Sequence, residues 1–194
     1  MKINTTFKSM LIACMASFLL VVACETKNKM DSNELAEEKN EDKFDDKAEK
    51  NADFVAEVAK SNLSEIKLSR LAADRAKSND VKEFANMMIE QHKMLYSENA
   101  DYAKKNNISY ADTIAGNDIS GYDALMKEKG SDFDKKYINT MVDDHKNTID
   151  KFEEVSTSDK YSKEVASMAT AALPKIRMHY DKAKNIQAMM ENKK

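Results

Sequence analysis

Two stretches, Phe84–Lys93 (FANMMIEQHK) and Tyr137–Lys146 (YINTMVDDHK), carry the same pattern and decide the fold class. An aromatic residue, Asn, Met, a β-branched residue, an acid, His and Lys recur at identical offsets in both. Their apolar side chains return every three or four positions, which is the period of one face of an α-helix. We therefore predict two helices that present the same face, each with a histidine at its centre.

The helical period continues through the chain from Asp53 onward and predicts four long helices. We expect them at residues 53–78, 80–105, 132–156 and 160–191. The first two and the last two are separated by short breaks, whereas residues 106–130 form a long connection. Two tight hairpins joined by one long crossover is the connectivity of ferritin-like bundles. The predicted fold is all-α, an antiparallel four-helix bundle with the crossover between its second and third helices.

Two local signals refine these helices. Ser131-x-x-Asp134 has the spacing of a capping box and is expected to open the third helix. Pro174 lies inside the fourth helix, where its missing N–H predicts a kink.

The composition supports helices and excludes several classes of function. Only 3 Gly, 1 Pro and no Trp occur in 194 residues, a mixture that disfavours turns and strands. The net charge of −3 gives no basic surface for nucleic acid. The two cysteines, Cys14 and Cys24, both precede the predicted helices. Disulfides, zinc–thiolate sites and a cysteine nucleophile are therefore excluded from the bundle.

The N-terminal segment has the organisation of a bacterial export signal. Lys2 and Lys8 precede an apolar run of 14 residues, which is shorter than the ~20 needed to span a bilayer. The run ends in Val-Val-Ala-Cys24, which resembles the lipobox of bacterial lipoproteins. We expect residues 1–23 to be a signal peptide and Cys24 to be lipidated, which anchors the chain to the membrane; a plain signal anchor is the alternative. Glu25, in place of Asp, favours the periplasmic side of the outer membrane within the cell envelope.

A charged segment follows the predicted lipid anchor. Residues 25–52 contain 16 charged residues among 28 and few large apolar side chains. Such a segment buries too little surface to offset its conformational entropy. We predict that residues 24–52 form the lipidated cysteine and a disordered tether, with a frayed charged helix as the alternative, and that residues 53–194 form the bundle domain.

Each predicted helix turns one metal-binding type of side chain toward the apolar face. At 100° per residue, His92 and His145 fall at the centre of their apolar arcs, and His179 falls inside the edge of its arc. The acid on the apolar arc of the first helix is Glu65. Buried carboxylates and imidazoles need partners. Either they hydrogen-bond to one another, with Asn62 among the helping amides, or they hold a metal ion.

The residue types restrict which metal would fit. No Glu-x-x-His pair occurs, so a di-iron carboxylate centre is not expected. Three imidazoles and one carboxylate would suit a single zinc, copper or iron ion. Met88 and Met141 precede two of the histidines by four residues and would favour copper, although Met at this spacing is usually core. Asp144 and Gln91 flank the inward arcs and are candidates to hold the ligand side chains through hydrogen bonds.

The heights of the four residues along the bundle agree only in part. Glu65 and His92 are each about 13 residues from the first hairpin turn, so they should lie at one level. His145 lies about 10 residues before the predicted third helix ends, whereas His179 lies about 19 after the fourth begins. This offset corresponds to roughly 13 Å at 1.5 Å per residue. His179 is therefore expected to be the member that fits least well.

The sequence also resembles a known bacterial family, that of the domain of unknown function 4142. The resemblance covers residues 53–187 and rests on Glu65-x-x-Leu68-x-x-Leu71-Ala72, Val81-Lys82-x-Phe84-Ala85-x-Met87-Met88-x-x-x-His92, Phe133-Asp134-x-x-Tyr137-Ile138-x-x-Met141-Val142-x-Asp144-His145 and Leu173-Pro174-x-x-x-x-His179. It implies an exported, ferritin-like helical bundle and no established activity. Gln91 departs from the Asp that the family usually has before this histidine.

The sequence favours a non-enzymatic binding, structural or stress-related role at the membrane. No nucleophile stands beside a base on the inward faces, and no Gly-rich loop could cradle a phosphate. The alternative is a metal-binding protein that uses Glu65, His92, His145 and His179.

Overall fold

The computed structural model describes residues 31–192, and within this range the chain is helical without any β-strand. This confirms the all-α prediction. The elements are α1 (Glu34–Glu41), α2 (Asp46–Arg75), α3 (Asn79–Lys105), the 3₁₀ turn η1 (Gly116–Asp118), α4 (Tyr122–Lys127), α5 (Gly130–Thr157) and α6 (Lys163–Glu191). The predicted signal peptide and Cys24 lie outside the described residues.

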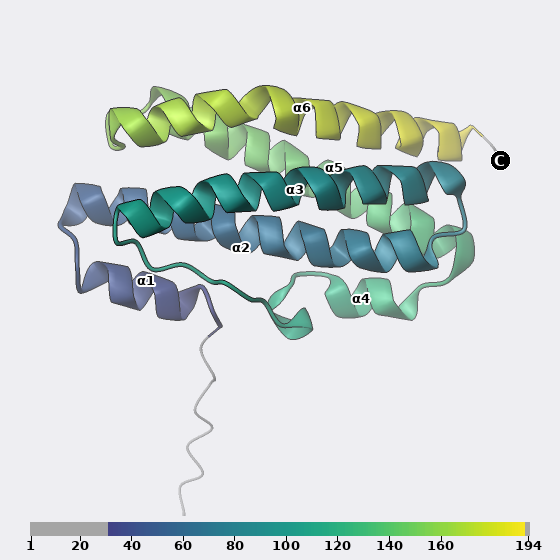
Figure 1. The fold of residues 1–194 in the computed structure, drawn as a ribbon. Helices are drawn as coiled ribbons and strands as arrows, with labels where there is room; N and C mark the ends of the chain where they lie inside the picture. Colours follow the sequence, from purple (N-terminus) through teal and green to yellow (C-terminus); the bar gives the residue numbers. More distant parts are fainter. Residues whose placement is uncertain (1–30, 193–194) are drawn as a thin grey trace, which may run out of the picture.

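Four long helices form the bundle as two antiparallel hairpins, α2 with α3 and α5 with α6 (Figure 1). Residues 106–129 cross from one hairpin to the other along the side of α2, and they carry η1 and α4 (Figure 1). α6 continues through Pro174 as one helix. Between Asn33 and Asn192, no helix is both long enough and apolar enough to cross a membrane.

Over residues 34–52 the structure is largely helical, as in the charged-helix alternative to a disordered tether. α1 packs against α2, and α2 begins at Asp46, where the Asp45 side chain accepts a hydrogen bond from the Ala48 N–H. The Asn40 side chain is fully buried and pairs with the backbone of Ser109 through two hydrogen bonds of 2.8 and 3.0 Å. The charge content of this segment does not reveal the packing, because the partner of Asn40 lies in the crossover, 69 residues away.

The predicted capping box at Ser131 and Asp134 is wrong. α5 begins at Gly130, whose φ of +56° lies in the left-handed region that glycine tolerates. The carboxylate of Asp134 points instead to the α2–α3 turn, where it accepts the backbone N–H groups of Lys77 (2.9 Å) and Ser78 (2.8 Å). Asp134 therefore caps the neighbouring hairpin at the start of α3 and ties the two hairpins together.

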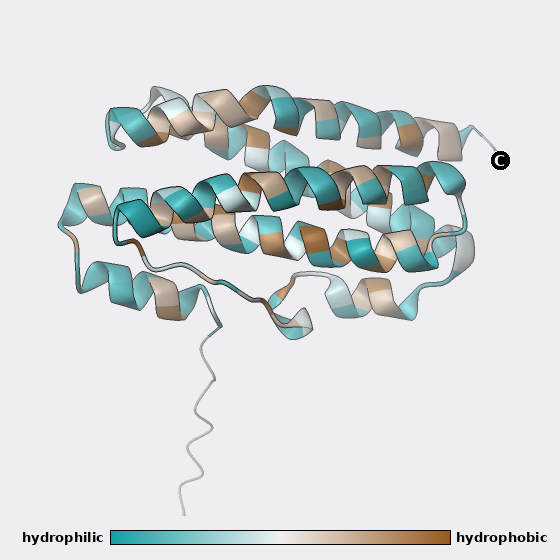
Figure 2. Ribbon diagram, viewed as in Figure 1, coloured by the Kyte–Doolittle hydropathy of each residue, from teal (hydrophilic) through white to brown (hydrophobic). Residues whose placement is uncertain are grey.

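Apolar side chains form two clusters, one toward each end of the bundle. Figure 2 shows hydrophobic and hydrophilic residues alternating along each long helix, as expected for amphipathic helices. One cluster is centred on Phe84, Phe133 and Tyr137 and includes Met88 and Met141, whose burial in it identifies them as core residues. The other is centred on Phe54, Phe152 and Val165. Neither apolar cluster contains the inward histidines or Glu65, which lie between them along the helices.

Candidate metal centre

Each of the four long helices contributes one polar side chain to a buried group in the bundle interior. The group consists of Glu65 from α2, His92 from α3, His145 from α5 and His179 from α6, and we call it the His/Glu cluster. Its members are no more than 5% exposed. The structure thus brings together all four residues that sequence periodicity placed on the inward faces.

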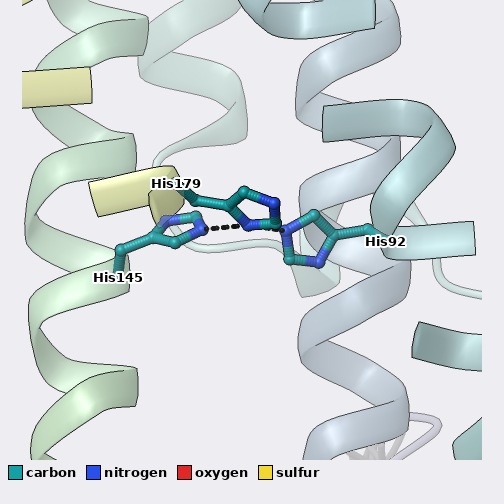
Figure 3. Close-up of side chains that lie close together, drawn as sticks. All are labelled: His92, His145 and His179. Carbon is teal, nitrogen blue, oxygen red and sulfur yellow. Dashed lines mark hydrogen bonds between the residues drawn. The ribbon is translucent and has the colours of Figure 1, made fainter. Parts of the chain in front are cut away.

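The ligand nitrogens of the three histidines all lie within 4.8 Å of one another, close enough to share one ion, and Glu65 contacts two of these rings. The Glu65 Oε2 atom is 3.0 Å from His92 Nε2 and 3.4 Å from His145 Nε2. The His179 Nδ1 atom is 3.2 Å from His92 Nε2 and 3.3 Å from His145 Nε2 (Figure 3). Ligands ~2.0–2.1 Å from one metal ion are separated by ~2.9–3.4 Å in octahedral to tetrahedral geometry. The four separations match this range.

The outward nitrogen of every ring has an oxygen atom as its partner. His92 Nδ1 is 2.9 Å from Asn62 Oδ1, and the Asn62 amide is oriented by its own N–H bond to the Val58 carbonyl. His145 Nδ1 is 2.8 Å from the backbone carbonyl of Met141. His179 Nε2 is 2.7 Å from Gln91 Oε1. An oxygen acceptor requires a donor, so each neutral ring carries its proton on the outward nitrogen.

With all three rings neutral, the inward side of the cluster is made of acceptors alone. Three ring nitrogens direct lone pairs inward, and they meet a carboxylate oxygen, Glu65 Oε2, that has no hydrogen-bond partner among the described residues. A buried acceptor left without a donor costs ~1–3 kcal/mol, and more when it is charged. A cation at the centre would satisfy all four atoms at once.

Burial and mutual proximity determine the charge states of the cluster. Burial lowers the pKa of His145, and burial together with the neighbouring His92 and His145 rings lowers the pKa of His179 to about 3. Burial alone would raise the pKa of Glu65, but the positive charge that His145 and His92 can carry, together with a hydrogen bond from His92, more than offsets this and lowers it to about 2. At neutral pH Glu65 is therefore ionised, and the rings of His145 and His179 are neutral, which is the form that binds metals.

His179 fits the cluster because the last hairpin has a longer connection than predicted. α6 begins at Lys163, where Ser162 caps it by accepting the Val165 N–H, and Asn51 holds the Ser162 backbone. His145 is 157 − 145 = 12 residues from the end of α5, and His179 is 179 − 163 = 16 residues from the start of α6. The offset is four residues, or roughly 6 Å, instead of the expected nine residues.

Of the two residues that flank the inward arcs, Gln91 contacts a ring of the cluster and Asp144 makes no hydrogen bond to one among the described residues. The Gln91 side chain on α3 does make such a hydrogen bond, to the His179 ring on α6. Its position beside His92 was a weak signal, because adjacent residues on one helix point in different directions. Asn62, one of the expected amides, does contact His92.

One comparison with known proteins gives a match. The family described as "Domain of unknown function (DUF4142)" matches residues 28–186, which is most of the chain. No significant match exists among curated proteins or solved structures.

Proposed function

Because the chain belongs to the DUF4142 family, whose description carries no activity, we propose its function from the geometry alone: it binds one transition-metal ion in the His/Glu cluster. The observation that carries the proposal is the convergence of three imidazole nitrogens and one carboxylate oxygen in the buried interior, with every ring held from outside by an oxygen atom. Three imidazoles and one carboxylate suit zinc, copper or iron. The single carboxylate is too few for a di-iron centre.

The competing function is a purely structural polar core, which requires protons between the inward atoms of the cluster. Without a metal ion, inward contacts of 3.0–3.4 Å require a proton between at least two pairs of acceptors. Each such proton needs either a doubly protonated ring in the buried interior or a ring that gives up its outward hydrogen bond to Asn62, the Met141 carbonyl or Gln91. Metal binding satisfies the inward and outward atoms together, so it is favoured.

We test the proposal by measuring the metal content of the purified protein by mass spectrometry. We expect about one zinc, copper or iron ion per chain, and at least a 100-fold loss of affinity in His92→Ala, His145→Ala and the isosteric Glu65→Gln. Met94→Ala, at an exposed position of α3, is the matched control and should retain the metal. Circular dichroism shows whether each variant is folded. A folded wild-type chain that takes up none of the three metals overturns the proposal.

We further propose that the chain acts as a lipid-anchored protein of the cell envelope, with a binding role and no catalysis. The support is the sequence of residues 1–24, in which a basic start and a short apolar run end at Cys24. Metabolic labelling with a fatty acid is expected to label the wild type and Cys14→Ala, but not Cys24→Ala. Equal labelling of all three, or of none, contradicts the anchor.

A further inference from the structure

A pocket of about 480 Å³ lies between the two hairpins and reaches the His/Glu cluster. All four long helices line it. Glu65, His92 and His145 belong both to the pocket wall and to the cluster, whereas His179 does not line the pocket. The open side of the cluster is therefore the face formed by these three residues, opposite His179. A metal ion held there would be approachable from the pocket.

The wall of the pocket beyond the cluster is mainly apolar. Its apolar lining comes from both hairpins and includes Phe54, Val58, Leu95, Phe152, Ala172 and Ile176. The volume falls within the ~300–1,000 Å³ of small-molecule sites, which combine an apolar wall with a few convergent polar groups. In this pocket the buried polar groups are the three cluster residues together with Asn62 and Asn99, whose amide N–H groups already donate to the Val58 and Val55 carbonyls.

Charge selects the kind of ligand that would enter. A divalent ion bound by one carboxylate and three neutral imidazoles leaves one positive charge, which a monoanionic donor would neutralise in the low-dielectric interior. Lys151 and Lys175 line the same pocket and are partly buried. Glu57 and Glu98 also line it, but both are exposed, so solvent screens their charges more strongly.

We propose that the pocket binds a small apolar monoanion, such as a medium-chain carboxylate, whose head group reaches the metal ion through the face formed by Glu65, His92 and His145. The apolar body of the ligand lies along the wall between the hairpins. This inference rests on the proposed metal binding and names the ligand class of the same site.

The test titrates the full chain, loaded with Co²⁺ as a spectroscopic probe, with octanoate, octanol and acetate. Octanol keeps the apolar body without the charge, and acetate keeps the carboxylate without the apolar body. We expect octanoate to bind at least ten-fold more tightly than either and to change the visible absorption of Co²⁺. Octanoate that binds no better than acetate or octanol, or that leaves the Co²⁺ absorption unchanged, overturns the inference.

Two variants of α6 locate the site. Ala172→Phe fills the pocket and is expected to weaken octanoate binding at least ten-fold while Co²⁺ remains bound. Thr170→Phe adds the same ring at an exposed position outside the pocket lining and should change neither. The three-probe comparison on the wild type stands even if Ala172→Phe fails to fold.

The two proposals fail in distinguishable ways. A chain that holds the metal but shows no preference for octanoate overturns only the ligand inference. A chain that takes up no Co²⁺, zinc, copper or iron overturns the proposed function and this inference with it.

Discussion

Helices α3 and α5 carry the same ten-residue pattern, yet they hold their histidines in different ways. On α3, the His92 ring is fixed by a side chain from α2, that of Asn62. On α5, the His145 ring is fixed by the carbonyl of Met141, one turn earlier in its own helix. The shared pattern therefore places both rings in the interior, and the neighbouring helices decide how each ring is oriented.

The same contrast holds at two further pairs of matching positions. Gln91 on α3 contacts the His179 ring, whereas its counterpart Asp144 contacts no ring of the cluster. Phe84 and Tyr137 meet edge to face with centroids 6.2 Å apart, but only Tyr137 has a hydroxyl, which pairs with Ser69 at 2.8 Å. Equivalent sequence positions thus differ wherever a polar group finds a partner on another helix.

The largest expected effect is acid destabilisation of the metal-free protein through the rings on α5 and α6. The folded-state pKa of His179 is about 3 and that of His145 is also lowered, against an ordinary value of 6.5. Below pH 6.5 the unfolded chain therefore binds protons at these rings that the folded chain does not, so their contribution to stability falls as the pH falls. The Glu65 pKa of about 2 acts in the same direction below pH 4.5. Burial raises the pKa of Asp144 to about 7 and that of Asp53 to about 6, and these two groups act in the opposite direction.

Urea unfolding at pH 7 and pH 4, with a chelator present, measures this effect. We expect this pH change to lower the free energy of unfolding of the wild type by about 3 kcal/mol relative to that of His179→Phe, in which Asp144 and Asp53 still titrate. The same pH dependence in both proteins would assign the effect to other groups.

The next largest effect concerns Asp134, whose counterpart on α3 in the shared register is the apolar Val81. Asp134→Ala removes the acceptor for two backbone N–H groups at the start of α3 and is expected to cost ~2–3 kcal/mol of stability. Asp132→Ala, at an exposed position in the first turn of α5, is the control and should change stability by less than ~0.5 kcal/mol. Equal effects of the two substitutions, measured by urea unfolding, would contradict the tertiary cap.

A third experiment compares Gln91 with its counterpart Asp144. Gln91→Ala frees the outward nitrogen of His179 and is expected to lower metal affinity by ~10–100-fold. Asp144→Ala should lower it by less than ~3-fold, because that side chain holds no ring. Competition with a chromophoric chelator measures both affinities. A larger loss from Asp144→Ala would show that the metal-bound cluster uses the acid on α5 after all.

The smallest effect concerns the hydroxyl that distinguishes Tyr137 from Phe84. Tyr137→Phe leaves the buried Ser69 hydroxyl without its partner and is expected to cost ~1 kcal/mol of stability. The double variant Ser69→Ala/Tyr137→Phe should cost less than the sum of the single variants, as measured in a double-mutant cycle. Additive costs would show that the two hydroxyls do not interact.

The sequence predicted the elements that depend on local periodicity. The four long helices, their inward faces and the positions of the four cluster residues on those faces follow from the 3.6-residue period, and the structure confirms the all-α bundle. Its errors share one cause. The sequence placed the helix over residues 34–52 second to a disordered tether because the pairing of Asn40 with a distant segment leaves no local signal, and the capping box failed because Asp134 is paired with the opposite hairpin.

The sequence by itself determined which residues of this protein point inward, because helical periodicity is a property of each segment alone. Only the tertiary structure decided which of their atoms meet. The start of α6 at Lys163 brought the His179 ring within 3.3 Å of His145, and Asn62, Gln91 and the Met141 carbonyl fixed the direction of each ring. Register between helices depends on connection lengths and on hydrogen bonds between residues far apart in sequence, and no local pattern encodes these.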